Sequence, residues 1–430
     1  MVNLPIEYSD QKVTPFGGMR LMKEMLDQLK IRDIFSQLAL PERGSNRAYH
    51  AHEIIEGFWL SIWTGASRFI HADWLRYDTV LQDIFGFTRM PSQSTYSRFF
   101  GKFSWQRNTE VFTKLNKWFF GKIHIGTITL DLDSTIITRY GEQEGAHKGY
   151  NPKKPGRNSH HPLIAFLSQT RMVINAWMRP GNTSSLSNCI NFLKETLDIL
   201  SDKKVGLIRA DSGFYSDKVL SYLESMKLSY IIAVKFYETI KWEIQAVSQW
   251  VEICEGIAVA EAIYKGRRYV IVRKNIEKRP KATGKKLLFE DQIPHYRYSC
   301  YVTNLDVSAE EIWKLYQGRA DCENRIKELK YDFGADQFCL KSFWATEASF
   351  RFIMIAYNIL SLFRHIAVQK HTLSSMRTVK AYCFALGAWI RTHANRKVLK
   401  ISLPVQKRAW MDGLFAKIAD SSPPYSFSNA

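Results

Sequence analysis

The sequence predicts a mixed α/β protein, in which a central sheet is interrupted by a β-rich insertion and flanked by helical regions. Three observations support this fold class. Apolar residues recur at helical spacing before residue 122 and again after residue 342. The segment that follows Gly126, TITLDLDSTI, instead alternates apolar and polar residues, as a strand does. The chain has 430 residues, which is enough for two or three domains with large cores.

The composition indicates a globular protein that meets a polyanion. Hydrophobic residues make up 46% of the chain, and 60 Lys and Arg residues face 41 acidic ones, for a formal charge of +19. Nucleic acid is the first candidate for so basic a protein, and no strongly basic amphipathic helix indicates a membrane surface. The longest apolar run, Phe352 to Phe363, has the length of a core helix and not of a membrane span.

The cysteines and the N-terminus favour a cytoplasmic protein without a membrane partner. The six cysteines are scattered without a C-x-x-C pair, so neither a zinc ribbon nor a disulfide framework is predicted. The first residues, MVNLPIEYSDQK, lack the charged and then apolar pattern of a signal peptide.

The N-terminal region, residues 1–122, is predicted to be helical. Segments such as MRLMKEMLDQL and HEIIEGFWLSIW are amphipathic. The segment PSQSTYSRFF, residues 91–100, begins with serine caps and carries Tyr96 and Arg98. It is either a recognition helix or a capped core helix anchored by Phe99 and Phe100.

Residues 123–236 are predicted to contain the first part of the sheet, in the order β-β-β-α-β-α-β. Asp131 and Asp133 share the open face of the first strand. The fourth strand, KKVGLIRAD, ends at Asp211. Between them, the loop YNPKKPGRNSHHP is basic, and its His160 and His161 are expected to contact phosphate or solvent.

The later regions differ in composition. Residues 237–305 are rich in β-formers and aromatic residues and are predicted to be an insertion, with KNIEKRPKATGKK as a basic loop. Residues 306–341 contain one long helix. Residues 342–430 are predicted to be helical, with RTHANRKVLK as a basic stripe.

The long helix, from Glu311 to Asp336, carries the most specific pattern. At about 100° per residue, four polar positions fall within an arc of roughly 60°, beside an apolar ridge. These four positions are Tyr316, Arg319, Glu323 and Lys330. A solvated helix face with ordinary charge pairs is the alternative. A carboxylate beside two cations and a phenol also suits a metal ligand next to a phosphate backbone.

Three acidic positions form a candidate catalytic set. The first strand carries Asp133, with Asp131 as the alternative, the fourth strand ends at Asp211, and the long helix carries Glu323. Carboxylates at the ends of adjacent strands make an oxygen cage that suits hard divalent cations. Two such ions about 4 Å apart promote phosphoryl transfer. No G-x-S-x-G, Walker, H-E-x-x-H or G-x-G-x-x-G motif is present.

Together, LDLDST, RADSGF and the Y-x2-R-x3-E-x6-K helix resemble DDE-type bacterial insertion-sequence transposases. The resemblance is to the branch whose RNase H-like catalytic domain is interrupted by a β-insertion before the glutamate. The helix signature matches at every spacing, and the motifs cover roughly Gly126 to Asp336. The flanking helical regions match in general layout only.

The resemblance implies an RNase H-like core formed by residues 123–236 and 306–341, with residues 1–122 as the DNA-binding region. It implies two Mg²⁺ ions, replaceable by Mn²⁺, bound by Asp133, Asp211 and Glu323. It also implies DNA contacts, and these fall to Tyr316, Arg319, Lys330, Lys153, Lys154 and Arg157.

The partners that the resemblance implies are double-stranded DNA, as terminal inverted repeats and target, and a second copy of the chain. The location would be the bacterial cytoplasm, at the nucleoid. Cut-and-paste transposition through hairpin ends is expected, with Trp242 or Trp250 stacking on a flipped base unless each is buried in the insertion's own core. Two alternatives remain, namely a nuclease that does not join ends and an inactive DNA-binding repressor.

Overall fold

A computed structural model describes residues 4–281, 284–285, 295–369, 375–394 and 396–427. The chain forms two compact units, each made of segments that are distant in the sequence. The first unit comprises Met1–Ile123, Glu142–Glu144 and Lys327–Tyr425. The second unit comprises His124–Gly141, Gly145–Ile326 and Ser426–Ala430. The N-terminal and C-terminal helical regions, predicted as separate domains, therefore belong to one unit.

The first unit is built around α12 (Phe343–Phe363), a helix that is buried on all sides. Trp59 and Trp63 of α3 (Ala51–Trp63) donate hydrogen bonds to the carbonyl oxygens of Phe352 and Ala356, at 2.9 and 3.1 Å. Removing the N-terminal helices would expose this core, because the indoles of α3 pack directly on α12. The other helices of the unit are α1 (Met19–Leu29), α2 (Ile31–Phe35), η1 (Phe69–Tyr77), α4 (Thr79–Phe85), α5 (Gln93–Phe100), α6 (Trp105–Gly121), η3 (Arg364–Val368), α13 (Met376–Val379), η4 (Lys380–Phe384) and α14 (Val405–Ala419).

Within the described residues, only the helical stretch Phe343–Val368 is long and apolar enough to cross a membrane. Of its apolar window, 78% is buried inside the structure. Burial of this extent favours the predicted core helix, because a membrane span would present its apolar side chains to lipid.

Helix α5 is a capped core helix. The hydroxyl of Ser92 accepts a hydrogen bond from the Thr95 backbone N–H at 3.3 Å. Tyr96 is fully buried, whereas Arg98 is exposed. Tyr96 is therefore part of the hydrophobic core, so the structure favours the capped core helix over the recognition helix.

The C-terminal region is not helical throughout, as the sequence had suggested. Strands β15 (Ala388–His393) and β16 (Arg396–Ile401) form a hairpin, and β1 (Val13–Thr14) pairs with the start of β15. The basic stripe thus lies on a β-ribbon. The reason is local, because Trp389, Ile390 and Val398 favour strands and Ala394 turns the chain with a positive φ of 47°.

The second unit contains a nine-stranded mixed sheet in the order β11-β12-β13-β14-β10-β9-β3-β7-β8. Strands β3, β7 and β8 are antiparallel neighbours, and β9 and β10 run parallel to β3. This is the predicted RNase H-like order of three antiparallel strands followed by two parallel ones. The strands are β3 (Thr127–Ser134), β7 (Leu163–Leu167), β8 (Met172–Trp177), β9 (Lys204–Ala210), β10 (Tyr230–Ala233), β11 (Val251–Cys254), β12 (Ile257–Tyr264), β13 (Arg267–Asn275) and β14 (Tyr296–Thr303).

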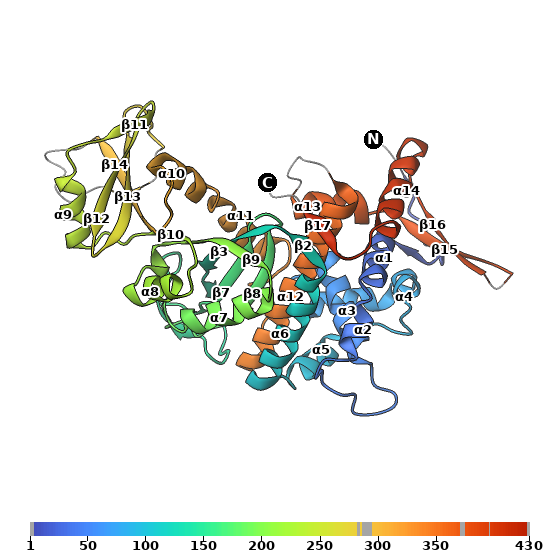
Figure 1. Cartoon of the computed structure of the whole chain (residues 1–430). Coiled ribbons are helices and arrows are strands. Elements are labelled where there is room, and N and C mark those ends of the chain that lie inside the picture. The colour runs from blue at the N-terminus through green and yellow to red at the C-terminus, as the bar shows by residue number, and fades with distance from the viewer. Residues whose placement is uncertain (1–3, 282–283, 286–294, 370–374, 395, 428–430) are drawn as a thin grey trace. The chain divides into compact units, whose positions relative to one another are not determined.

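Helices α7 and α8 of the second unit occur in the predicted order, whereas its short strands and α9 were not predicted (Figure 1). Its helices are α7 (Cys189–Leu200), η2 (Ser212–Phe214), α8 (Asp217–Ser225), α9 (Glu238–Ala246), α10 (Ala309–Gln317) and the first part of α11 (Ala320–Tyr331). A small antiparallel sheet joins β4 (Ile137–Thr138), β6 (Asn158–His160) and β5 (His147–Lys148). Strands β2 (Ile123–Ile125) and β17 (Tyr425–Phe427) lie where the chain passes between the units.

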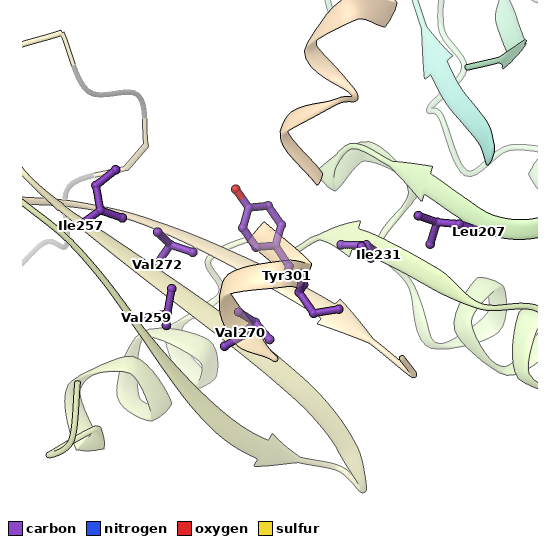
Figure 2. Close-up of a cluster of buried hydrophobic side chains, with 9 residues drawn as sticks. Leu207, Ile231, Ile257, Val259, Val270, Val272 and Tyr301 are labelled. Atoms are coloured by element: carbon purple, nitrogen blue, oxygen red, sulfur yellow. The ribbon is translucent and has the colours of Figure 1, made fainter. Parts of the chain in front are cut away.

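The β-rich insertion extends the central sheet of the second unit and is not a separate domain. Thr303 at the end of β14 pairs both with Ile231 of β10 and with Arg268 of β13. One hydrophobic cluster also spans the junction (Figure 2). It includes Leu207, Ile231, Ile257, Val259, Val270, Val272, Tyr301, Ala309 and Ile312. The insertion therefore has a fixed position relative to the strands of the core.

The predicted single helix over residues 311–336 is two helices, α10 and α11, separated at Gly318 and Arg319. Arg209 of β9 stabilises the break, because its Nη1 donates to the carbonyl oxygen of Leu315 at 2.6 Å. A Cβ on residue 318 would lie 2.5 Å from the same nitrogen, so a larger residue here would displace the Arg209 guanidinium. The four signature residues therefore do not share one straight helix face.

Candidate active site

The two aspartates of β3 have different environments. Asp131 is 3% exposed and accepts hydrogen bonds from both arms of Arg209, at 2.6 and 2.7 Å. Arg209 lies opposite Asp131 on the adjacent strand β9. Burial raises the pKa of Asp131, and the hydrogen bonds and charge of Arg209 oppose that shift. Both oxygens of Asp131 are thus bound to a guanidinium, which leaves Asp133 as the available carboxylate of this strand.

Asp133 and Asp211 come together because β3 and β9 are adjacent and parallel, so that their C-terminal ends meet. The carboxylate of Asp133 lies 3.1 Å from Arg319 Nη2, and that of Asp211 lies 4.0 Å from the same atom. Backbone N–H groups orient both side chains, from Ser134 at 2.7 Å and from Gly213 at 2.8 Å. Two of the three predicted ligands therefore converge on one point.

The two aspartates differ in burial. The side chain of Asp133 is 8% exposed, whereas that of Asp211 is 39% exposed. Burial raises the pKa of Asp133 to about 6; Arg319 opposes the shift and the neighbouring Asp211 adds to it.

Arg319 supplies a positive charge between these carboxylates. The residue is buried, and its Nη2 also lies 3.5 Å from the carbonyl oxygen of Leu132. Burial lowers the pKa of its guanidinium, but Asp133, Tyr316 and Asp211 raise it by more. The buried Nε has no hydrogen-bond partner within the described part of the chain. The aspartates therefore already accommodate one cation at this position.

Glu323 does not join the two aspartates. It is exposed on α11, and the described residues contain no group of three His, Cys, Asp or Glu side chains close enough to bind a metal ion. Asp133 and Asp211 still fit a divalent cation in their chemistry, because they are oxygen donors that converge around a positive charge. A three-carboxylate site would require Glu323 to approach this pair.

A cleft of about 980 Å³ lies between the insertion and the α10–α11 segment. Glu323, Arg319 and Tyr316 line it from the signature segment. Its other polar and aromatic lining residues are Lys274, Arg279, Lys281, Tyr301, Trp313 and Gln317. The cleft is therefore basic, has aromatic walls and adjoins the carboxylates, which are features that suit a nucleic-acid backbone.

Tyr316 contacts both the cleft and the sheet. Its ring centroid is 4.3 Å from that of Tyr301, and its hydroxyl lies 3.4 Å from the carbonyl oxygen of Ala210. Burial raises the pKa of Tyr316, so the phenol stays protonated and remains a donor.

The sequence did not single out Trp313, the tryptophan that lines the cleft. Its position could have indicated this role, because Trp313 lies three residues before Tyr316 and therefore on the same side of α10. Trp250 packs on Arg273, at 4.3 Å, and on Tyr298 instead. Trp242 is 61% exposed on α9. Neither of these two is among the described lining residues of the cleft.

The remaining predicted DNA contacts are distributed over the chain. Lys153, Lys154 and Arg157 are exposed on the loop between β5 and β6. The ammonium of Lys154 lies 4.8 Å from the centroid of the Tyr140 ring. Lys330 is half-buried on the part of α11 that belongs to the first unit.

The two histidines of this loop region are structural, contrary to the expectation that they contact phosphate or solvent. His160 is buried, and its Nδ1 accepts a hydrogen bond from Arg139 at 3.1 Å. His161 lies 3.2 Å from the hydroxyl of Ser134, which is 2.9 Å from that of Ser185. These contacts support the strand end that carries Asp133, so the basic loop composition was misleading for the histidines.

Comparison with known proteins identifies the family of the chain. The family model for the transposase DDE domain, group 1, matches residues 3–423. No curated protein sequence matches the chain. A cryo-EM structure of the piggyBac transposase synaptic complex with hairpin DNA is similar at a TM-score of 0.48 and 13% identity, over 96% of this chain and 85% of that chain. The Drosophila P element transposase strand transfer complex has a TM-score of 0.26 and 12% identity, over 93% and 88%. Because the family model matches nearly the full length, the chain belongs to the DDE transposase family, group 1.

Proposed function

We propose that this transposase cleaves the ends of its own insertion sequence and joins them to target DNA by divalent-metal-dependent phosphoryl transfer. The observation that carries the proposal is the convergence of Asp133 and Asp211 on one cationic point at the ends of adjacent strands. In addition, Glu323 lines the basic cleft together with Arg319, the residue that contacts both aspartates. Family membership supplies the class of enzyme.

Asp133, Asp211 and Glu323 would bind the metal, as two Mg²⁺ ions or as Mn²⁺ in their place. Bound divalent ions supply activation of the attacking oxygen and stabilisation of the leaving oxygen. Arg319 neutralises the aspartates in the free protein and lines the cleft, so it is the residue placed to exchange a carboxylate for a DNA phosphate. Tyr316 would hold the same phosphate with its protonated hydroxyl.

Second-strand cleavage through a hairpin fits this arrangement. The freed 3′-hydroxyl would attack the opposite strand, and closing so tight a hairpin requires unstacking a base at a cost of a few kcal/mol. Stacking on an aromatic ring returns about 1–3 kcal/mol per base. Trp313 is the candidate for this contact, in place of Trp242 and Trp250, because it lines the cleft beside Tyr316.

Two further expectations belong to this proposal. A dimer would bring two element ends to one target, and the enzyme would work at the nucleoid of a bacterial cytoplasm. Light scattering on the DNA complex checks the first expectation, and an active complex of one chain on one end would contradict it.

The test is cleavage of a duplex that carries the inverted repeat flanking the coding region. Asp211→Ala and Glu323→Ala should each abolish cutting in Mg²⁺ while DNA binding survives, because the basic and aromatic side chains that would contact the DNA are unchanged. Glu311→Ala is the matched control, since Glu311 is an exposed acid on α10. Wild-type rates in either carboxylate variant would overturn the assignment.

The same reaction separates the alternatives. A nuclease that never joins ends would release cut DNA without forming target joints. A repressor would bind the duplex and leave it uncut in both Mg²⁺ and Mn²⁺. The presence of Asp133 and Asp211 argues against the repressor. Burying a charged carboxylate such as Asp133 lowers the stability of the fold, and a protein without catalytic activity would gain nothing from it.

A further inference from the structure

The β15–β16 hairpin is a ribbon with two unlike faces. Directly opposite residues of an antiparallel pair point to the same face, and successive pairs alternate. One face carries Ala388 with Ile401, Ile390 with Leu399, and Thr392 with Lys397. The other, here called the basic face, carries Trp389 with Lys400, Arg391 with Val398, and His393 with Arg396.

The first face is anchored within its unit. Ala388 is 1% exposed, and Ile390 and Leu399 are half-buried. The ammonium of Lys397 lies 2.6 Å from a carboxylate oxygen of Asp83 on α4. This face of the ribbon is therefore the one that packs toward α4, and the basic face points away from it.

The basic face is exposed and its charge is not neutralised. Arg391, Arg396 and Lys400 are all exposed, and none of them makes an ion pair within the described residues. Strand β1 pairs only with Ala388 and Trp389, so the rest of the ribbon extends beyond that strand. Figure 1 shows the hairpin projecting as a two-stranded arm past α4.

The dimensions of this arm match one groove of DNA. Strands of a ribbon lie about 4.8 Å apart, so two strands with their side chains fit the major groove of B-DNA, which is about 12 Å wide. Arginine is the side chain that pairs with the O6 and N7 edge of guanine in that groove. A membrane surface is less suited, since the exposed part of the basic face carries one large apolar residue, Val398.

We propose that the basic face enters the major groove of double-stranded DNA, with Arg391 and Arg396 at guanine edges and Lys400 on a phosphate. This inference rests on the proposed function, because the DNA in question is the end that the enzyme cuts. It assigns base contacts to the C-terminal ribbon, in addition to any made by the N-terminal helices.

The test measures binding of the full-length protein in EDTA, so that cleavage does not enter. The probe is a duplex with the inverted repeat that flanks the coding region. Arg391→Ala/Arg396→Ala should bind about 10–100-fold more weakly, since two arginine contacts are lost. Arg377→Ala/Lys407→Ala is the matched control, because it removes two exposed cations elsewhere in the same unit and should change affinity less than about twofold.

A chemical readout locates the groove. Methylation of guanine N7, which lies in the major groove, should block wild-type binding at specific guanines, and this interference should vanish in the double alanine variant. Arg391→Lys/Arg396→Lys should also lose the interference while retaining most of the affinity, because lysine keeps the charge without the fork. Equal thermal midpoints for all variants would show that the ribbon still folds.

Three results would overturn the inference. The first is that Arg391→Ala/Arg396→Ala binds the duplex as tightly as Arg377→Ala/Lys407→Ala does. The second is that methylation interferes with wild-type binding only at adenine N3, in the minor groove. The third is that Arg391→Ala/Arg396→Ala loses binding to anionic phospholipid vesicles but still binds DNA like the wild type. A wild-type protein that binds the duplex in EDTA but leaves it uncut after Mg²⁺ is added would contradict the proposed function instead. The two failures are therefore distinguishable.

Discussion

Asp131 and Asp133 lie two residues apart on the same face of β3, yet their surroundings differ completely. Asp131 meets a guanidinium from the adjacent strand, which binds both of its oxygens at 2.6 and 2.7 Å. Asp133 meets a guanidinium from the turn between two helices, at 3.1 Å, together with a second carboxylate from Asp211. The first pair is held by the sheet, whereas the second depends on the α10–α11 segment.

The difference teaches how one strand combines a carboxylate held within the sheet with the carboxylate to which we assign the catalytic role. Arg209 also donates to the hydroxyl of Ser168 and the carbonyl of Leu315, so its pairing with Asp131 joins the sheet to α10. Arg319 has a buried Nε without a partner in the described chain and lines the cleft. The Asp131 pair is therefore fully hydrogen-bonded, and we expect the Asp133 pair to be the one that exchanges with a ligand.

The largest expected effect separates the two aspartates by activity. Asp133→Asn should lower DNA cleavage in Mg²⁺ by roughly 10⁴-fold, or more than about 5 kcal/mol, because it removes a charged ligand of the reaction. The Asp131→Asn protein should cleave DNA at a rate within about tenfold of the wild-type rate, when both rates are expressed per folded molecule. Full activity in Asp133→Asn with a dead Asp131→Asn would reverse the assignment.

The next effect separates them by stability. Arg209→Met should lower the free energy of unfolding by about 3–5 kcal/mol, because it leaves the buried Asp131 carboxylate without its partner. Urea denaturation of the metal-free protein measures this change. The control is Asp131→Leu/Arg209→Met, which removes both charges and should recover most of the loss. An unfolding midpoint for Arg209→Met equal to that of wild type would refute the structural role.

Arg319 allows a finer test of the exchangeable pair. Arg319→Ala should still nick the first strand but should form hairpin ends about 10–100-fold more slowly, since one charged phosphate contact is lost. Denaturing gels of the cleaved ends resolve the two products. Lys314→Ala, an exposed cation on α10, is the matched control. The hairpin route is wrong if early time points of the wild-type reaction contain double-strand breaks and no hairpin species.

The smallest effect is the pH dependence of metal binding. The pKa of Asp133 is raised to about 6 by burial, so below pH 6 a divalent ion must displace a proton from this carboxyl group. Mn²⁺ affinity should therefore fall by about tenfold per pH unit below 6 and should level off above it. Calorimetry in buffers of different ionisation enthalpy should detect about one proton released at pH 5 and none at pH 7.5. Proton release that persists in Asp133→Asn would assign the titration to another group.

Local periodicity determined much of this protein. The alternation of TITLDLDSTI places both aspartates on one face of β3, and the main strands and helices from Gly126 to Ala233 have the predicted order, as β3, β7, β8, α7, β9, α8 and β10. These features depend on residues within one element, so a short window of sequence contains the information.

Tertiary structure alone decided which carboxylate is available and where the signature helix breaks. Both outcomes depend on Arg209, which lies 78 residues from Asp131 and 106 residues from Leu315. The same holds for Trp313, which joins the cleft only because α10 packs on the strands of the insertion. The composition of residues 342–430 predicted helices and did not indicate the β15–β16 hairpin. The basic face of this hairpin is defined by cross-strand pairs such as His393 with Arg396. Contacts between residues far apart in the chain leave no periodic trace, and the folded protein alone brings them together.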